Sequence, residues 1–193
     1  MIKTSSPWLD ATPDQRRYPG LVGDVKADVV VVGAGIVGVM TAWELEKRGV
    51  KVVLLEKNHV ATGDTGFTTA FITRIPDTSI SRLRELYDLD FVRRVLAATR
   101  LAQQYLKKTI LDEQIDCGYK ECDSYYCAYQ AGDPTLQAEW SALKEVDDLV
   151  EWVSGPAVQN VNSKIAEAIK IKNEARFDVR KFIFGLLARP RLC

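Results

Sequence analysis

The stretch that decides the fold is Asp28-Val29-Val30-Val31-Val32-Gly33-Ala34-Gly35-Ile36-Val37-Gly38. Its first part is short, β-branched and almost wholly apolar, which is typical of a parallel strand that is buried on both faces. The glycines follow at G-x-G-x-x-G spacing, and a helical pattern of apolar residues covers residues 36–48. A second apolar strand is expected at residues 51–55, so the segment predicts a right-handed βαβ unit.

The glycine turn predicts a binding site for a dinucleotide. Gly33 permits the tight turn, Gly35 lets the backbone approach a pyrophosphate, and Gly38 lets the helix pack closely on the strand. The phosphates would lie at the helix N-terminus, where Ile36 and Val37 form the first turn and unpaired N–H groups favour negative charge. A turn with a purely structural role is the alternative.

Glu56 closes the second strand and is followed by Lys57. A carboxylate at this position can accept hydrogen bonds from the hydroxyls of an adenosine ribose. The same carboxylate should repel a 2′-phosphate, which disfavours NADP. The βαβ unit alone does not distinguish FAD from NAD.

The next segment, Thr62-Gly63-Asp64-Thr65-Gly66-Phe67-Thr68-Thr69-Ala70, resembles the FAD-dependent family that includes D-amino-acid oxidase, glycine oxidase and sarcosine oxidase. The resemblance implies that this loop runs beside the pyrophosphate, the ribityl chain and the flavin ring. Phe67 and Thr68 stand where the family commonly has an Arg-Asn pair. The loop is closer to the branch whose longer members carry a Rieske domain, and no cysteine of this chain is assigned to such a domain.

The family resemblance implies FAD as the cofactor and oxidation of a C–N bond in a small amine or amino acid, with hydride transfer to the flavin. No catalytic residue can be identified. The candidate cofactor-binding residues are Gly33, Gly35, Ile36, Val37, Gly38, Glu56, Lys57, Gly63, Thr65, Gly66, Thr68 and Thr69.

The expected fold class is α/β, a Rossmann-like FAD/NAD(P)-binding βαβ unit with added helices and a partial, truncated second region. Residues 1–26 are expected to form an extended N-terminal arm, and residues 27–193 an FAD-binding domain that is incomplete at its C-terminus. The chain would then be an N-terminal fragment that lacks a C-terminal half or a complementary chain. Two other functions stay open. One is a noncatalytic dinucleotide-binding or interaction module. The other is an NAD-dependent dehydrogenase, which the threonine-rich loop (residues 62–70) disfavours.

The composition narrows the choice of partners. Lys plus Arg and Asp plus Glu both number 26, so no charge excess favours nucleic acid or an anionic membrane. No apolar run approaches the roughly 20 residues of a membrane-spanning helix, and no signal peptide is visible, so we expect a cytoplasmic protein. The spacing of Cys117, Cys122 and Cys127 predicts no metal site.

Patterns along the remainder of the chain predict further elements. Arg74 is expected in an ion pair on the surface, and Asp178 is expected to cap the last helix. The expected elements are one or two helices at 79–115, one or two strands at 119–129, a helix at 135–153, short strands at 157–176 and a helix at 179–188.

Overall fold

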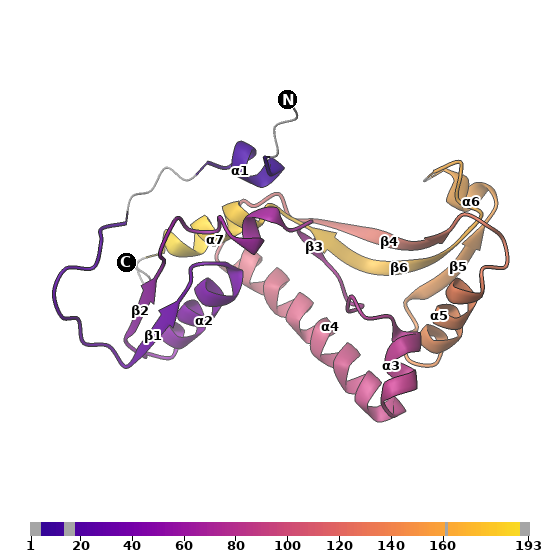
Figure 1. Cartoon of the computed structure of the whole chain (residues 1–193), viewed down its shortest axis with the longest axis horizontal. Helices are drawn as coiled ribbons and strands as arrows, with labels where there is room; N and C mark the ends of the chain where they lie inside the picture. The colour runs from indigo at the N-terminus through magenta and orange to yellow at the C-terminus, as the bar shows by residue number, and fades with distance from the viewer. Residues whose placement is uncertain (1–4, 14–17, 161, 190–193) are drawn as a thin grey trace. The chain divides into compact units, whose positions relative to one another are not determined.

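The computed structural model describes residues 5–13, 18–160 and 162–189, which fold as two compact units (Figure 1). The first unit contains the described residues up to Ala70, together with Ile110–Tyr119 and the described residues from Phe177 onward. The second unit contains Phe71–Thr109 and Lys120–Arg176. The chain therefore leaves the first unit and returns to it twice.

The first unit contains the predicted βαβ arrangement. Strands β1 (Val29–Val32) and β2 (Val52–Leu55) are parallel and in register, and helix α2 (Ile36–Lys47) connects them. The prediction that β1 is buried on both faces is wrong, because Val30 and Val32 are 56% and 82% exposed. Alternate residues of a strand point to opposite faces, and α2 packs on the face that carries Val31.

Helix α7 (Val179–Leu187) completes the core of the first unit. The Asp178 carboxylate accepts hydrogen bonds from the N–H groups of Arg180 and Lys181, both at 3.0 Å, which confirms the predicted N-cap. Helix α7 packs against α2. Gly185 allows this helix to approach Ile115, since a Cβ on the glycine would lie 2.5 Å from Cγ2 of the isoleucine.

The sequence pattern predicts an extended N-terminal arm, but part of this arm is helical. Helix α1 (Pro7–Ala11) begins after Ser6, whose hydroxyl oxygen accepts a hydrogen bond from the N–H of Trp8 at 3.2 Å. Serine at the N-cap followed by proline at the first helical position is a favoured helix start. This local signal is sufficient to explain one short helix.

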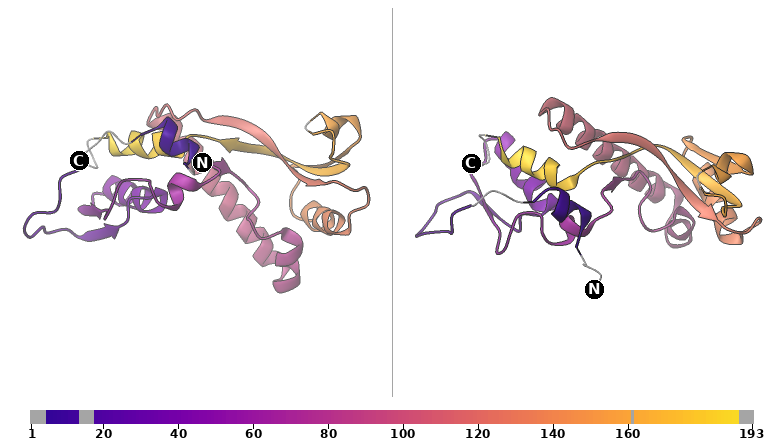
Figure 2. Two further views of the ribbon diagram at one scale, coloured as in Figure 1. Left: turned by 45° about the horizontal axis from the view of Figure 1, so that its top comes forward. Right: turned by 90° about the horizontal axis from the view of Figure 1, so that it is seen from above.

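The second unit is built around one long central strand, β6 (Glu167–Arg176), rather than the several short strands expected at 157–176. Strand β4 (Lys120–Ala128) pairs antiparallel with β6, with an irregularity between Cys122 and Ser124, and the two strands run side by side in every view of Figures 1 and 2. The strands β3 (Phe71–Ile72) and β5 (Val150–Ser154) also pair antiparallel with β6.

Helices and the sheet together form the core of the second unit. The segment at 79–115 contains two helices, α3 (Ile80–Leu86) and α4 (Leu89–Asp112), as one of the two predicted alternatives. The buried Glu139 of α5 (Pro134–Lys144) accepts hydrogen bonds at 2.8 Å from the N–H groups of Ile80 and Ser81, which begin α3. The buried apolar core comprises Ile80, Leu83, Val92, Leu96, Ala128, Leu136, Leu143, Ile169 and Ile171.

The prediction of one helix at 135–153 is wrong in its second half. Helix α5 ends at Lys144, and β5 occupies the end of the predicted helix. Apolar residues at 143, 146, 150 and 153 suit helical spacing, but Trp152 pairs with Ile169 in the sheet instead. A short helix, α6 (Pro156–Gln159), follows. Among the described residues, no helix is long and apolar enough to cross a membrane.

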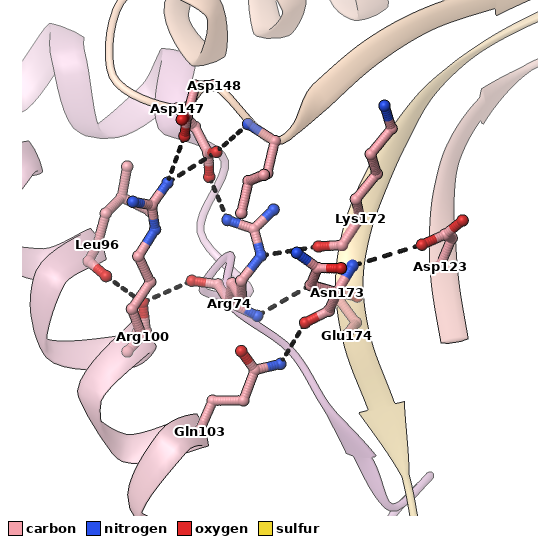
Figure 3. A network of polar contacts seen from close by, with 12 residues as sticks. Arg74, Leu96, Arg100, Gln103, Asp123, Asp147, Asp148, Lys172, Asn173 and Glu174 are labelled. Carbon is pink, nitrogen blue, oxygen red and sulfur yellow. Dashed lines mark hydrogen bonds and ion pairs between the residues drawn. The ribbon is translucent and has the colours of Figure 1, made fainter. Parts of the chain in front are cut away.

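Arg74 is buried rather than placed on the surface, which corrects the sequence-based expectation. Its side chain is 2% exposed and forms an ion pair with Asp147. The backbone N–H of Arg74 donates to Glu174 at 2.9 Å, and its Nε donates to the carbonyl of Lys172 at 3.0 Å (Figure 3). Asp147 also forms an ion pair with Arg100, with 2.8 Å between Oδ1 and Nη2. These partners are distant in the sequence, so no local pattern could have predicted the network.

We expect Asp147→Ala to destabilise the protein by about 3–5 kcal/mol, because it leaves the buried Arg74 guanidinium without its carboxylate. Asp148→Ala is the matched control, since that carboxylate is 86% exposed and touches only the edge of the network, 3.4 Å from Arg100. The control should cost less than about 1 kcal/mol. Urea unfolding followed by circular dichroism measures both. Equal losses would show that the buried pair contributes no more than a surface pair.

Candidate functional site

The glycine turn is held in shape by backbone contacts. Gly33 has φ of 100°, a left-handed conformation that other residues rarely adopt, and its N–H donates to the carbonyl of Leu55 at 2.7 Å. A Cβ on Gly38 would lie 1.9 Å from the carbonyl oxygen of Gly33 and 3.5 Å from Cγ1 of Val31. Gly38 therefore permits the close packing of α2 on the turn and the strand, as predicted.

The sequence predicts that the phosphates of a dinucleotide bind at the N-terminus of α2. Gly35 is the N-cap, with extended backbone and no side-chain capping bond. The first N–H groups of a helix lack partners within it, and here the N–H of Ile36 donates to Thr65 Oγ1 at 3.0 Å. A Cβ on Gly35 would lie 3.0 Å from the same hydroxyl. Thr65 thus joins the threonine-rich loop directly to the helix start.

The Glu56 carboxylate faces the same turn from the end of β2. Its Oε2 accepts a hydrogen bond from the N–H of Ala34 at 2.9 Å, and its Oε1 accepts one from the N–H of Asn58 at 2.8 Å. These two backbone donors, Ala34 first, lower the pKa of Glu56 below its ordinary value. Each oxygen has a second acceptor position, so both can still bind a ligand hydroxyl.

The threonine-rich loop turns through a short 3-10 helix, η1 (Asp64–Phe67). Ala61, immediately before the loop, donates its N–H to the carbonyl of Ala34 at 3.0 Å. This hydrogen bond connects the loop to the glycine turn. Gly66 is buried, and a Cβ there would lie 2.8 Å from the carbonyl oxygen of Ala61. Gly66 thus has a packing reason of its own, beyond any contact with a ligand.

Single hydrogen bonds bring the segments of the candidate site together. Hydrogen bonds connect the glycine turn to Glu56 and to Thr65. Other candidates lie on the same segments with exposed side chains or, for glycine, exposed backbone. These residues are Val37, Lys57, Gly63, Thr68 and Thr69.

Residues of the N-terminal arm contact this loop, and the sequence patterns did not identify them. The Ser6 hydroxyl donates to the carbonyl of Gly66, and Trp8 Nε1 donates to the carbonyl of Thr68 at 2.7 Å. The Ser6-Pro7 capping signal could have predicted the helix that carries these side chains. It could not have predicted which loop the helix contacts.

The cysteines show no sign of a reactive or metal-binding role in the part of the chain that the structure describes. No group of three or more His, Cys, Asp or Glu residues within it is arranged to hold a metal ion. Burial raises the pKa of the thiols of Cys117, Cys122 and Cys127, which keeps them protonated and weakly nucleophilic at neutral pH.

Comparison with known proteins places this geometry in a family. The family model described as FAD dependent oxidoreductase matches residues 28–191. A candidate Rieske 2Fe-2S iron-sulfur protein, YhfW, of Bacillus subtilis (strain 168) is 33% identical over 184 residues, which cover 93% of this chain and 35% of that protein. Gamma-glutamylputrescine oxidoreductase of Escherichia coli (strain K12) is 26% identical over 117 residues, which cover 61% of this chain and 28% of that protein.

A solved structure shows the same fold. Glycine oxidase from Geobacillus kaustophilus superposes with a TM-score of 0.66 at 19% identity, over 83% of this chain and 43% of that chain. The chain thus spans about a third of the length of the two curated relatives. The similarity to YhfW agrees with the resemblance of the threonine-rich loop to the branch with Rieske domains.

We expect Gly38→Ala to destabilise the first unit by about 1–3 kcal/mol, because the added methyl group meets a backbone carbonyl that cannot move away without distorting the turn. Gly63→Ala is the matched control: its φ is −79° and no atom lies within 4 Å of the added Cβ. That control should stay within about 0.5 kcal/mol of the parent. Thermal and urea unfolding report both values. Equal stability of the two variants would contradict the packing role of Gly38.

The lowered pKa of Glu56 predicts a defined pH dependence of stability. A carboxylate whose pKa is lower in the folded state stabilises the fold above its unfolded-state pKa, near 4.5, and loses that effect as the pH falls through the folded-state pKa. The difference in unfolding free energy between the parent and Glu56→Gln should therefore be constant from about pH 6 to 8 and shrink below about pH 4.5. Urea titrations from pH 3 to 8 measure it. A difference that grows on acidification would contradict the assignment.

Proposed function

Because the chain belongs to the family of FAD-dependent oxidoreductases, we propose that its glycine turn and threonine-rich loop bind FAD and that the protein oxidises an amine or an amino acid. The observation that carries the proposal is the pair of hydrogen bonds at the glycine turn, from Ala34 to Glu56 and from Ile36 to Thr65. They bring a carboxylate and a hydroxyl to the start of one helix.

The residues present fit the two chemically different parts of a dinucleotide. Gly35 presents backbone without a side chain at the N-terminus of α2, where N–H groups and the helix dipole favour a pyrophosphate. The Glu56 carboxylate stays ionised at neutral pH and keeps acceptor positions for ribose hydroxyls. Thr65 would exchange its bond with Ile36 for a place beside the phosphates.

The loop after the pyrophosphate site would meet the flavin half of the cofactor. Bound FAD supplies the redox chemistry, since it accepts a hydride equivalent from the substrate. The chain's own residues hold and orient it: Glu56 selects the adenosine end, and residues 65–69 line the path away from the helix start. The names of the relatives, glycine oxidase and gamma-glutamylputrescine oxidoreductase, support an amino acid or amine as the substrate class.

Titration of the purified chain with FAD, ADP and NAD tests the cofactor. We expect FAD and ADP to bind, and bound flavin to show absorption bands near roughly 375 and 450 nm. Anaerobic addition of a panel of amino acids and secondary amines then tests the substrate class, because a substrate bleaches the band near about 450 nm. Binding of NAD without FAD would overturn the cofactor assignment, and a panel without any effect on bound FAD would count against the substrate class.

We expect Glu56→Ala to weaken the binding of both FAD and ADP by about tenfold to a hundredfold, because a hydrogen bond to a charged acceptor contributes about 1.5–3 kcal/mol. Glu85→Ala is the control, since Glu85 is a 64% exposed carboxylate of α3 in the second unit. Isothermal titration calorimetry gives the dissociation constants, and circular dichroism shows that both variants are folded. Unchanged affinity in Glu56→Ala would remove the carboxylate from the proposed site.

A further inference from the structure

Helix α1 holds two backbone carbonyls of the threonine-rich loop. The Ser6 hydroxyl donates to the carbonyl of Gly66, and the indole N–H of Trp8 donates to the carbonyl of Thr68 at 2.7 Å. Leu9 lies over Gly66, since a Cβ on that glycine would be 3.2 Å from Cδ2 of the leucine. The N-cap residue and two side chains of one short helix therefore contact Gly66 and Thr68, the residues before and after Phe67.

The other end of α1 is fastened to the body of the first unit. The Thr12 hydroxyl donates to Asp178 Oδ2 at 2.6 Å. Asp178 also caps α7 and donates its own N–H to the carbonyl of Cys117 at 2.7 Å. Helices α1 and α7 lie side by side in both views of Figure 2 and contact each other. The contacts of α1 with the loop are thus anchored on a helix that packs against α2.

The loop needs support from outside its own sequence. Ala61 and Ala70 bracket it, and both have left-handed backbone, with φ of 54° and 55°. Residues with a Cβ adopt this conformation at a cost in free energy and keep it only where surrounding contacts enforce it. Between the two alanines, η1 is a single turn, which is too short to be stable alone. The contacts from Ser6, Trp8 and Leu9 fall within this stretch.

We propose that α1 is a brace that holds residues 65–68 in their binding position, and that Trp8 is a positioning residue for the flavin half of FAD. The proposal rests on the proposed function. Trp8 contacts the carbonyl of Thr68, three residues beyond the Thr65 that bonds to the glycine turn, whereas Glu56 contacts the turn itself. Loss of the brace should consequently affect FAD more than ADP.

Two substitutions remove the contacts with little change in shape. Trp8→Phe keeps an aromatic ring and removes the indole N–H. Ser6→Ala removes the hydroxyl that donates to Gly66 and that also caps α1. Ser5→Ala is the matched control, because the Ser5 hydroxyl donates to Asp10 at 2.6 Å, within the arm, instead of to the loop. Each variant is made in the full chain, with dissociation constants for FAD and for ADP measured by calorimetry.

We expect Trp8→Phe, which removes one hydrogen bond, and Ser6→Ala, which removes two, to raise the dissociation constant for FAD about threefold to tenfold. The constant for ADP should change by less than about twofold, and Ser5→Ala should leave both constants unchanged. In the ligand-free chain, amide hydrogen exchange at residues 65–69 should be faster in the two variants than in the parent. A merely structural role for α1 would instead weaken FAD and ADP equally.

Unchanged FAD affinity and unchanged exchange in Trp8→Phe and Ser6→Ala would overturn the brace, and so would an equal rise in both constants. Failure of the proposed function has a different signature: the parent chain would bind neither FAD nor ADP. In that case the positioning role of Trp8 falls with it. Exchange in the ligand-free variants then reports separately on the brace, with faster exchange supporting it and unchanged exchange rejecting it.

Discussion

The candidate site depends on one close approach between two pieces of backbone. Helix α2 can lie against the glycine turn only because Gly38 has no side chain, since a Cβ would reach within 1.9 Å of the carbonyl of Gly33. That approach places the first N–H groups of α2 directly after β1. Glu56 and Thr65 can then reach the turn by single hydrogen bonds, to Ala34 and Ile36. The position of the hydrogen-bonding groups of the candidate site therefore depends on the missing side chain at Gly38.

In the second unit, a charge network connects segments that are far apart in the sequence. Arg74 and Arg100 share the Asp147 carboxylate, and Glu174 accepts the N–H of Arg74. The hydroxyl of Thr99 donates to the carbonyl of Arg74, so the segment after β3 is held by α4, by the turn before β5 and by β6. Two cations and two carboxylates balance in this network, and their mutual attraction offsets part of the cost of removing them from water.

Sequence patterns predicted the parts of this fold that local chemistry determines. The glycine turn, α2 and the cap of α7 at Asp178 all follow from short stretches, because each depends on neighbours within a few residues. Patterns failed where distant partners decide. Apolar residues at 143, 146, 150 and 153 have the spacing of a helix, but pairing with β6 makes the last two part of a strand. Arg74 lacks any local sign of burial, since its partners lie on three other segments.

The hydrogen bonds from α1 to the loop, at Gly66 and Thr68, both end on backbone carbonyls. A hydrogen bond to a backbone carbonyl does not depend on the side chain of that residue. Substitutions in the loop can therefore leave these two hydrogen bonds in place. The side chains of Phe67 and Thr68 are both exposed, Phe67 to 64%. Gly66 is the exception, because Leu9 and the Ala61 carbonyl leave no room for a Cβ. Backbone contacts thus fix the position of the loop, in which Gly66 cannot be enlarged, and leave the exposed side chains of the candidate site free to vary.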